Sequence, residues 1–126
     1  MAREMPSFAK SPPVLVERFA AVLDRFPDVE RKQMFGFPAA FVGGNMVTGL
    51  MGERWQVRLP EDAATELLTI PGAGPFEPMP GRPMRGYYVV PPSIVDDDAA
   101  IETWVGRAID HGHSLPAKRP KAKKGR

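Results

Sequence analysis

Few residues in this sequence could do chemistry, and its two histidines are the first candidates. His111 and His113 lie two positions apart near the end of a predicted helix. Residues two apart on a helix point in different directions, so we do not expect them to bind one metal ion together. A histidine near a helix C-terminus is also explained by its interaction with the helix dipole. We therefore interpret both histidines as structural residues.

Three consecutive acids, Asp96, Asp97 and Asp98, are the next candidates, because carboxylates can hold a divalent cation. Their spacing lacks the alternating ligands of a calcium loop. Acids at the start of a predicted helix are typical of capping and of pairing with the helix dipole. We interpret this run as a helix start.

The sequence offers no nucleophile in a catalytic arrangement and no phosphate-binding loop. The chain has no cysteine, which excludes disulfides, thiolate metal sites and cysteine nucleophiles. Gly72, Gly74 and Gly81 stand among prolines, which remove the N–H donors that a phosphate cradle needs. The serines occupy lead-in, cap or turn contexts: Ser7, Ser11, Ser93 and Ser114. We therefore expect no catalytic residue, no metal site and no cofactor.

Arg58, Arg85 and Tyr87 are the candidate binding residues in the body of the chain. Alternation along the predicted strands allows all three to share one face of a sheet. Some domains bind single-stranded nucleic acid on such a face, through phosphate contacts and base stacking. A half-exposed sheet with a few arginines is also common without this role, so both interpretations stay open.

A basic segment ends the sequence. Residues 116–126 hold six Lys or Arg and no acid, whereas the rest of the chain has a net charge of −4. We expect a disordered polycation, because the segment has too little apolar surface to bury. It either binds nucleic acid weakly and non-specifically or serves as a solubilising end. Its candidate contact residues are Lys118, Arg119, Lys121, Lys123 and Lys124.

The elements that position these residues begin with a helix predicted over residues 12–26. Ser11 is expected to cap it, with Pro12 in its first turn. A stripe of apolar residues recurs along it at spacings of three and four: Leu15, Phe19, Val22 and Phe26.

Short apolar runs separated by glycine turns follow, at residues 34–37, 39–42, 46–51 and 55–59. This pattern predicts three or four antiparallel strands in a meander. In the last run, apolar residues alternate with Gln56 and Arg58. We expect that strand to bury one face and leave the other in water.

The second half of the chain adds a helix over about residues 61–69, a strand over residues 84–90 and a helix over about residues 97–112. Between them, residues 71–83 contain five prolines and three glycines, which predicts a stiff, irregular loop. The order predicts an α+β fold: an antiparallel sheet, made of a meander plus a later strand, with three helices packed mainly on one face. The domain spans residues 11–115, after a flexible lead-in over residues 1–10.

The expected core consists of large apolar residues on the predicted inner faces: Phe19, Phe26, Phe35, Trp55, Leu67, Tyr88, Trp104 and Val105. Gly86 lies inside the predicted last strand, where a glycine usually marks a bulge or a close neighbour. We expect a bulky residue to face it.

Composition agrees with a single globular domain, since 43% of the 126 residues are hydrophobic and 25% are charged. No apolar run approaches the ~18 residues of a membrane span. The N-terminus has no apolar signal-peptide core. We expect a cytoplasmic protein without membrane contact.

Two stretches resemble signatures of the TfoX N-terminal domain family. The first runs from Lys32 to Met46 and contains KQMFG and AFVGGNM; the second is Gly81 to Tyr87, GRPMRGY. The resemblance extends from about Leu15 to Leu115. It implies an α+β unit without catalytic activity or cofactor, related to bacterial competence regulators. Those regulators carry a second, helical domain after this one, whereas here the basic segment follows.

The resemblance favours a non-enzymatic regulatory or interaction module, with a protein partner of unknown identity or a second copy of the chain. A nucleic-acid-binding protein that uses the basic segment and the Arg/Tyr face is the first alternative. A small enzyme with an unrecognised site is the second.

Overall fold

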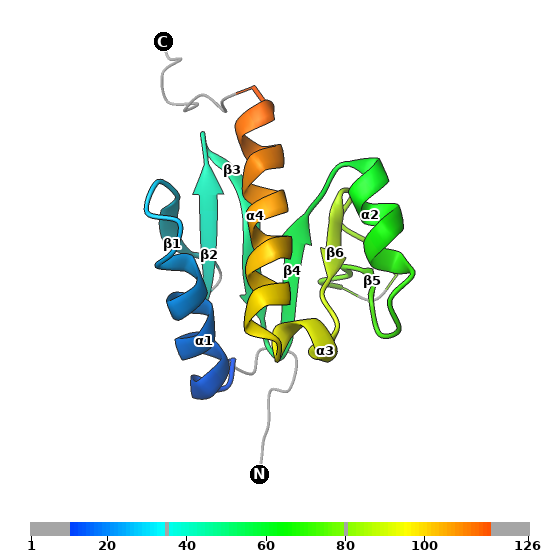
Figure 1. Ribbon diagram of the computed structural model, residues 1–126, viewed down its shortest axis with the longest axis horizontal. Coiled ribbons are helices and arrows are strands. Elements are labelled where there is room, and N and C mark those ends of the chain that lie inside the picture. The colour runs from blue at the N-terminus through cyan, green and yellow to red at the C-terminus, as the bar shows by residue number, and fades with distance from the viewer. Residues whose placement is uncertain (1–10, 35, 80, 117–126) are drawn as a thin grey trace.

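The computed structural model describes residues 11–34, 36–79 and 81–116, which form an antiparallel sheet with helices against it (Figure 1). The six strands lie in the order β1-β2-β3-β4-β6-β5. Their bounds are β1 Glu30–Met34, β2 Phe37–Val42, β3 Asn45–Met51, β4 Arg54–Arg58, β5 Gly74–Pro75 and β6 Tyr87–Val89. The helices are α1 Pro13–Leu23, α2 Glu61–Leu68, α3 Pro92–Val95 and α4 Asp98–Ser114. The predicted α+β fold is confirmed.

The helices lie on one face of the sheet, with α4 across its centre and α1 and α2 on either side (Figure 1). Trp55 of β4 is at the middle of this core, and its ring lies 5.1 Å from that of Phe19 in α1. Its indole Nε1 donates to the buried Thr48 Oγ1 at 2.9 Å, and that hydroxyl donates to the Gln56 carbonyl at 2.8 Å. None of the helices in the described residues is long and apolar enough to span a membrane.

Helix α1 is shorter than predicted and begins differently. Pro12 occupies the N-cap position, and no side chain caps the helix. Ser11 was expected to cap it, but its Oγ is buried without a hydrogen-bond partner among the described residues. The helix ends at Leu23, three residues before Phe26.

The meander follows the glycine turns. Gly43 and Gly44 turn β2 into β3 with φ values of 57° and 84°, which glycine adopts without steric cost. Gly36, at φ 84°, lies between β1 and β2, so the run predicted over residues 34–37 is divided between two strands. The first strand instead begins at Glu30, and its residues are largely exposed at the edge of the sheet.

The second half differs from prediction in three places. The proline-rich segment is not wholly irregular, because Gly74 and Pro75 pair with β6. The last strand spans only Tyr87–Val89, and a one-turn helix, α3, follows it. Gly86 lies in the turn before β6 with φ 85°, and a Cβ there would meet nothing within 4 Å. The expectation of a bulky neighbour is therefore wrong. Glycine is required at this position by the backbone conformation.

Most of the predicted core is confirmed. Residues buried as expected are Phe19, Trp55, Leu67, Trp104 and Val105. Phe26 and Tyr88 are only half-buried, since both pack at the margin of the core. Phe35 lies outside the described residues, as do the lead-in over residues 1–10 and residues 117–126 of the basic segment.

Candidate functional site

The predicted Arg/Tyr surface does not form as expected. Tyr87 is buried rather than exposed, and its hydroxyl donates to the Met46 carbonyl at 2.8 Å. The Arg58 guanidinium lies 5.5 Å from the centre of the Tyr87 ring. Arg85 is exposed in the turn before β6. Arg58 and Tyr87 are therefore brought together, but the ring is not available for base stacking.

The environment of Tyr87 also affects its ionisation. Burial raises the pKa of the Tyr87 hydroxyl above its ordinary value, because the charged form would lose its hydration. The nearby Arg58 opposes this shift by stabilising the phenolate. Tyr87 thus serves as a neutral hydrogen-bond donor within the sheet.

The other sequence candidates have structural settings. Asp97 is the N-cap of α4 and accepts from the Ala100 N–H at 3.0 Å, so the capping interpretation is confirmed. His111 and His113 lie in the last turn of the same helix. Among the described residues, no three His, Asp or Glu side chains gather as a metal-binding group. The candidates Lys118, Arg119, Lys121, Lys123 and Lys124 lie outside those residues.

The face of the sheet away from the helices carries a second apolar cluster. This corrects the prediction that one face of β4 is wet, because Gln56 on that face is only 3% exposed. The buried members of the cluster are Ala39, Phe41, Met46, Phe76 and Tyr87. Several partly buried side chains pack against it: Met34, Met51, Met84 and Val89.

Strand register explains why this face is hollow. Ala39 of β2 pairs with Gly49 of β3, which pairs with Gln56 of β4, and Gln56 pairs with Val89 of β6. Residues paired in this way lie side by side on one face. Two of the four, Ala39 and Gly49, have little or no side chain. The row therefore forms the low floor of a pocket between taller neighbours.

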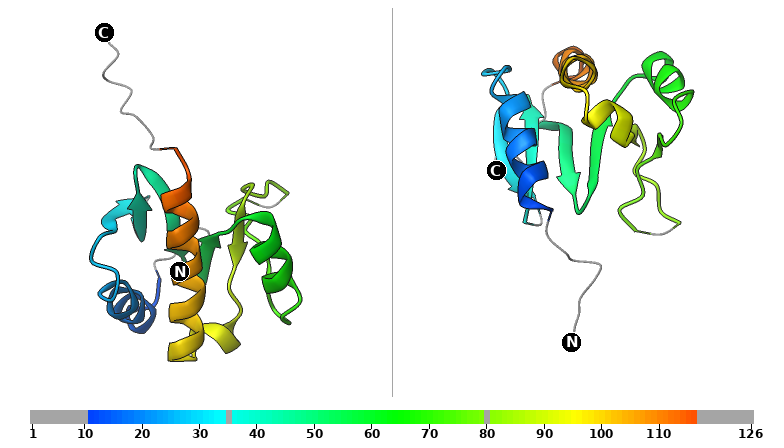
Figure 2. Two further views of the ribbon diagram at one scale, coloured as in Figure 1. Left: turned by 45° about the horizontal axis from the view of Figure 1, so that its top comes forward. Right: turned by 60° about the horizontal axis from the view of Figure 1, so that its bottom comes forward.

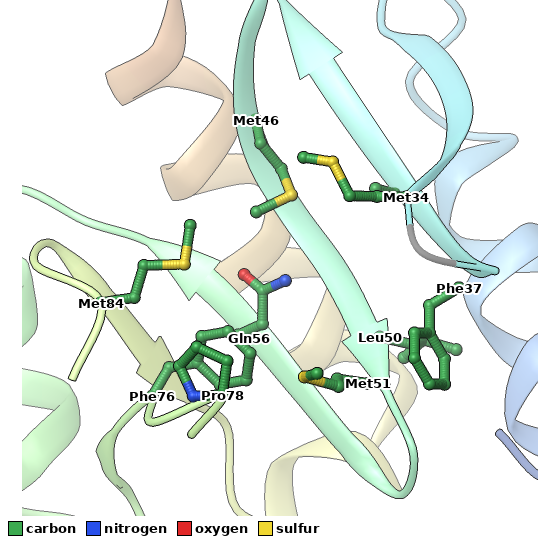
Figure 3. Close-up of a pocket in the computed structure, with 10 residues that line it drawn as sticks. Met34, Phe37, Met46, Leu50, Met51, Gln56, Phe76, Pro78 and Met84 are labelled. Carbon is green, nitrogen blue, oxygen red and sulfur yellow. The ribbon is translucent and has the colours of Figure 1, made fainter. Parts of the chain in front are cut away.

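Methionines form much of the pocket wall. The cavity has a volume of about 110 Å³ and is lined by Met34, Met46, Met51 and Met84, together with apolar neighbours (Figure 3). Met79, the remaining methionine of the described residues, is 61% exposed and lies outside the lining. The concentration of thioether side chains at one place makes this pocket the candidate site.

Gln56 is the polar side chain in this apolar setting. Its amide stands between the methionines (Figure 3). The amide Oε1 is buried and has no hydrogen-bond partner among the described residues. The amide Nε2 lies over Gly49, only 2.8 Å from where a Cβ on that glycine would stand. A side chain at position 49 would therefore displace the Gln56 amide.

Between β5 and β6, residues 76–79 and 81–86 cover one side of the pocket. This segment extends on the side of the sheet opposite α2 and α4 (Figure 2). The Met84 N–H donates to the Phe76 carbonyl at 2.8 Å, which closes the segment at its base. Arg54 of β4 attaches this segment to the sheet, because its Nη1 donates to the Glu77 carbonyl at 2.8 Å. These bonds position Phe76, Pro78 and Met84 against the floor.

Sequence reasoning missed this site, although part of its signal was present. Gln56 was placed correctly on the outward face of its strand, but that face was expected to be wet. Met34 begins one predicted apolar run, Met51 ends another, and Met84 follows the proline-rich segment. Only the folding of that segment across the sheet brings the methionines around Gln56.

Comparison with known proteins places this fold in a family. The TfoX N-terminal domain family matches residues 21–112, a range that includes the whole sheet and nearly all of α4. No curated protein and no solved structure matches the chain. On the match over residues 21–112, the chain belongs to the TfoX N-terminal domain family.

Proposed function

We propose that this domain is a non-enzymatic binding module, and that it binds an apolar group in the methionine-lined pocket. One observation carries the proposal: four methionines surround a hollow on the face of the sheet opposite the helices. Methionine side chains are flexible and polarizable, and they are common at surfaces that adapt to a ligand.

The size of the pocket supports a small ligand or a single inserted group. A cavity of about 150 Å³ lined by apolar side chains is large enough to bind benzene. The pocket here, at about 110 Å³, is of the same order. Met34, Met51 and Met84 are only partly buried, so the wall reaches the surface.

The chemistry of the lining supports binding rather than catalysis. The described residues that line the pocket are apolar apart from Gln56. An amide and thioethers supply neither a general acid nor a general base at neutral pH. They can hold a ligand by contact and by one or two hydrogen bonds.

Titration of the protein with toluene, followed through methionine methyl groups labelled with ¹³C, tests the proposal. Toluene should shift the signals of Met34, Met46, Met51 and Met84 in a saturable way. Met79 should not shift, which makes it an internal control. Binding in the pocket would be refuted by chemical-shift changes that increase linearly with toluene concentration. Changes as large at Met79 as at the lining methionines would also refute it.

Two matched variants sharpen this test. Ala39→Leu places a larger side chain on the pocket floor and should abolish the saturable shifts. Ala99→Leu makes the same change at an exposed position of α4 and should leave them unaltered. If Ala39→Leu is folded and still binds toluene with unchanged affinity, the pocket is not the binding site.

A further inference from the structure

We infer that the pocket takes a small, neutral aromatic molecule that carries one O–H or N–H donor, and that Gln56 Oε1 accepts from it. This inference rests on the proposed function and names the ligand chemistry of the same site. Phenol and indole are the simplest members of the class. Gln56, which lines the pocket, has an unpaired amide oxygen.

A buried amide oxygen without a partner is rare in folded proteins. Gln56 is 3% exposed, and its Oε1 finds no donor among the described residues. Thr48, buried on the opposite face, has both its hydrogen bonds made. The contrast between these two buried side chains of the sheet points to a donor that comes from outside the chain.

The neighbours of Gln56 cannot supply that donor. Along its cross-strand row, the flanking residues Gly49 and Val89 have no polar side chain. Two residues away on the same strand, Arg54 donates to the Glu77 carbonyl and Arg58 lies over the Tyr87 ring. Both arginines are thus engaged away from the Gln56 amide.

Lys32, at the end of the row, is also engaged with other groups. Lys32, at the β1 end, lies 5.2 Å from the centre of the Phe41 ring, and its Nζ is 3.6 Å from Glu30 Oε2. The row therefore offers Gln56 Oε1 no donor, and a ligand in the pocket can provide one.

The walls specify the rest of the ligand. Methionine sulfur makes favourable contacts with aromatic rings, and four methionines face this cavity. Phe37 and Phe76 add aromatic surface to the same lining. A single ring matches the volume of about 110 Å³.

The lining also restricts the charge of the ligand. Among the described lining residues, Gln56 is the only one with a polar side chain. An ionised ligand would lose its hydration there without a charged partner, which is strongly unfavourable. A carboxylate, a phosphate or an ammonium ion therefore does not fit. One neutral donor on an aromatic ring does.

The experiment compares phenol, anisole and toluene in the wild-type protein and in Gln56→Met. Phenol has a donor, anisole has only an acceptor, and toluene has neither. Phenol should shift the Gln56 side-chain amide signals as well as the methionine methyl signals. Gln56→Met should lower phenol affinity about tenfold more than toluene affinity, because only phenol loses a buried hydrogen bond.

Several results would overturn the inference. If Gln56→Met weakens phenol and toluene equally, or if anisole binds the wild type as tightly as phenol, the ligand does not donate to Gln56 Oε1. If Gln56→Met does not fold, wild-type Gln56 amide signals that stay fixed at phenol saturation contradict it equally. If N-acetyl-tyrosinamide binds as tightly as phenol, the pocket accepts the tyrosine side chain of a partner protein. The inference of a small-molecule ligand is then wrong. Failure of the proposed function gives a different result: neither phenol nor toluene then shifts the methyl signals of the lining methionines in a saturable way.

Discussion

Gly112 of α4 lies so close to Val47 of β3 that a Cβ on the glycine would stand 2.4 Å from Val47 Cγ1. Such a Cβ would also meet Val42 Cβ at 3.2 Å. Val47 is itself the extra residue of a register shift, since Phe41 pairs with Met46 and Ala40 with Thr48. The bulge and the glycine together let the end of α4 rest directly on the sheet.

Gly112→Ala should therefore destabilise the domain by about 1–3 kcal/mol through overpacking. Gly106 in the same helix is the matched control, because a Cβ there would meet the Phe26 ring at an ordinary 3.6 Å. Gly106→Ala should stabilise the domain by up to about 1 kcal/mol through helix propensity. Urea unfolding measures both. Equal effects of the two substitutions would contradict the close packing of α4.

The second prediction concerns Gly86, where the backbone conformation, and not the packing of neighbouring side chains, favours glycine. At φ 85° with no atom within 4 Å of a Cβ, Gly86→Ala should cost about 1–2 kcal/mol through left-handed strain alone. Gly74 also has open space around it but no positive φ, so Gly74→Ala should be close to neutral. Thermal melts of the two variants compare them. A neutral Gly86→Ala would show that the turn before β6 does not need this conformation.

His111 makes stability depend on pH. Burial lowers its pKa below 6.5, the charge of Arg58 lowers it further, and Asp62 opposes both. Between the folded pKa and 6.5, the unfolded chain binds more protons than the folded one, so stability falls as pH decreases below 6.5. Unfolding free energies at pH 7.5 and 5.5 measure this loss.

The matched variants for that measurement are His111→Gln and His113→Gln. His111→Gln should reduce the loss of stability between pH 7.5 and 5.5. His113→Gln changes an exposed histidine of the same helix and should leave the contribution of His111 in place. If His111→Gln keeps the full pH dependence, another group is responsible for it.

Nucleic-acid binding by the full chain should depend on the basic segment. Tyr87 is buried and cannot stack on bases, and the rest of the chain carries a net charge of −4. Removing residues 116–126 should abolish binding to a single-stranded oligonucleotide. For the full chain, affinity should fall steeply as salt is raised. If the shortened chain binds as tightly as the full one, Arg58 and Arg85 become the candidate contacts again.

The fold was largely predictable from the sequence because its signals are local. The apolar stripe around Phe19, the glycine turn at Gly43–Gly44 and the cap at Asp97 each depend on a few neighbouring residues. The boundaries of α1 and β6 were less predictable, since tertiary packing and proline placement decide where a pattern stops. The register shift at Val47 has no local signal in the sequence.

The site was not predictable in the same way. The alternation of residues along β4 placed Gln56 on the face of the sheet away from the helices, and this was correct. Whether that side is wet or covered depends on residues 76–79 and 81–86, which are distant in sequence and poor in regular structure. Their hydrogen bonds to each other and to Arg54 bring Phe76 and Met84 over the sheet. A long-range arrangement of this kind leaves no periodic pattern to recognise.

Nuclear Overhauser effects from the ring protons of bound phenol test whether the methionine-lined pocket holds the ligand. We expect contacts from these protons to the ε-methyl groups of Met34, Met46 and Met84, and from the hydroxyl side of the ring to the Gln56 amide. Contacts confined to Met79 or to side chains of α1 and α4, or saturable binding without any contact to the lining methionines, would contradict binding in this pocket.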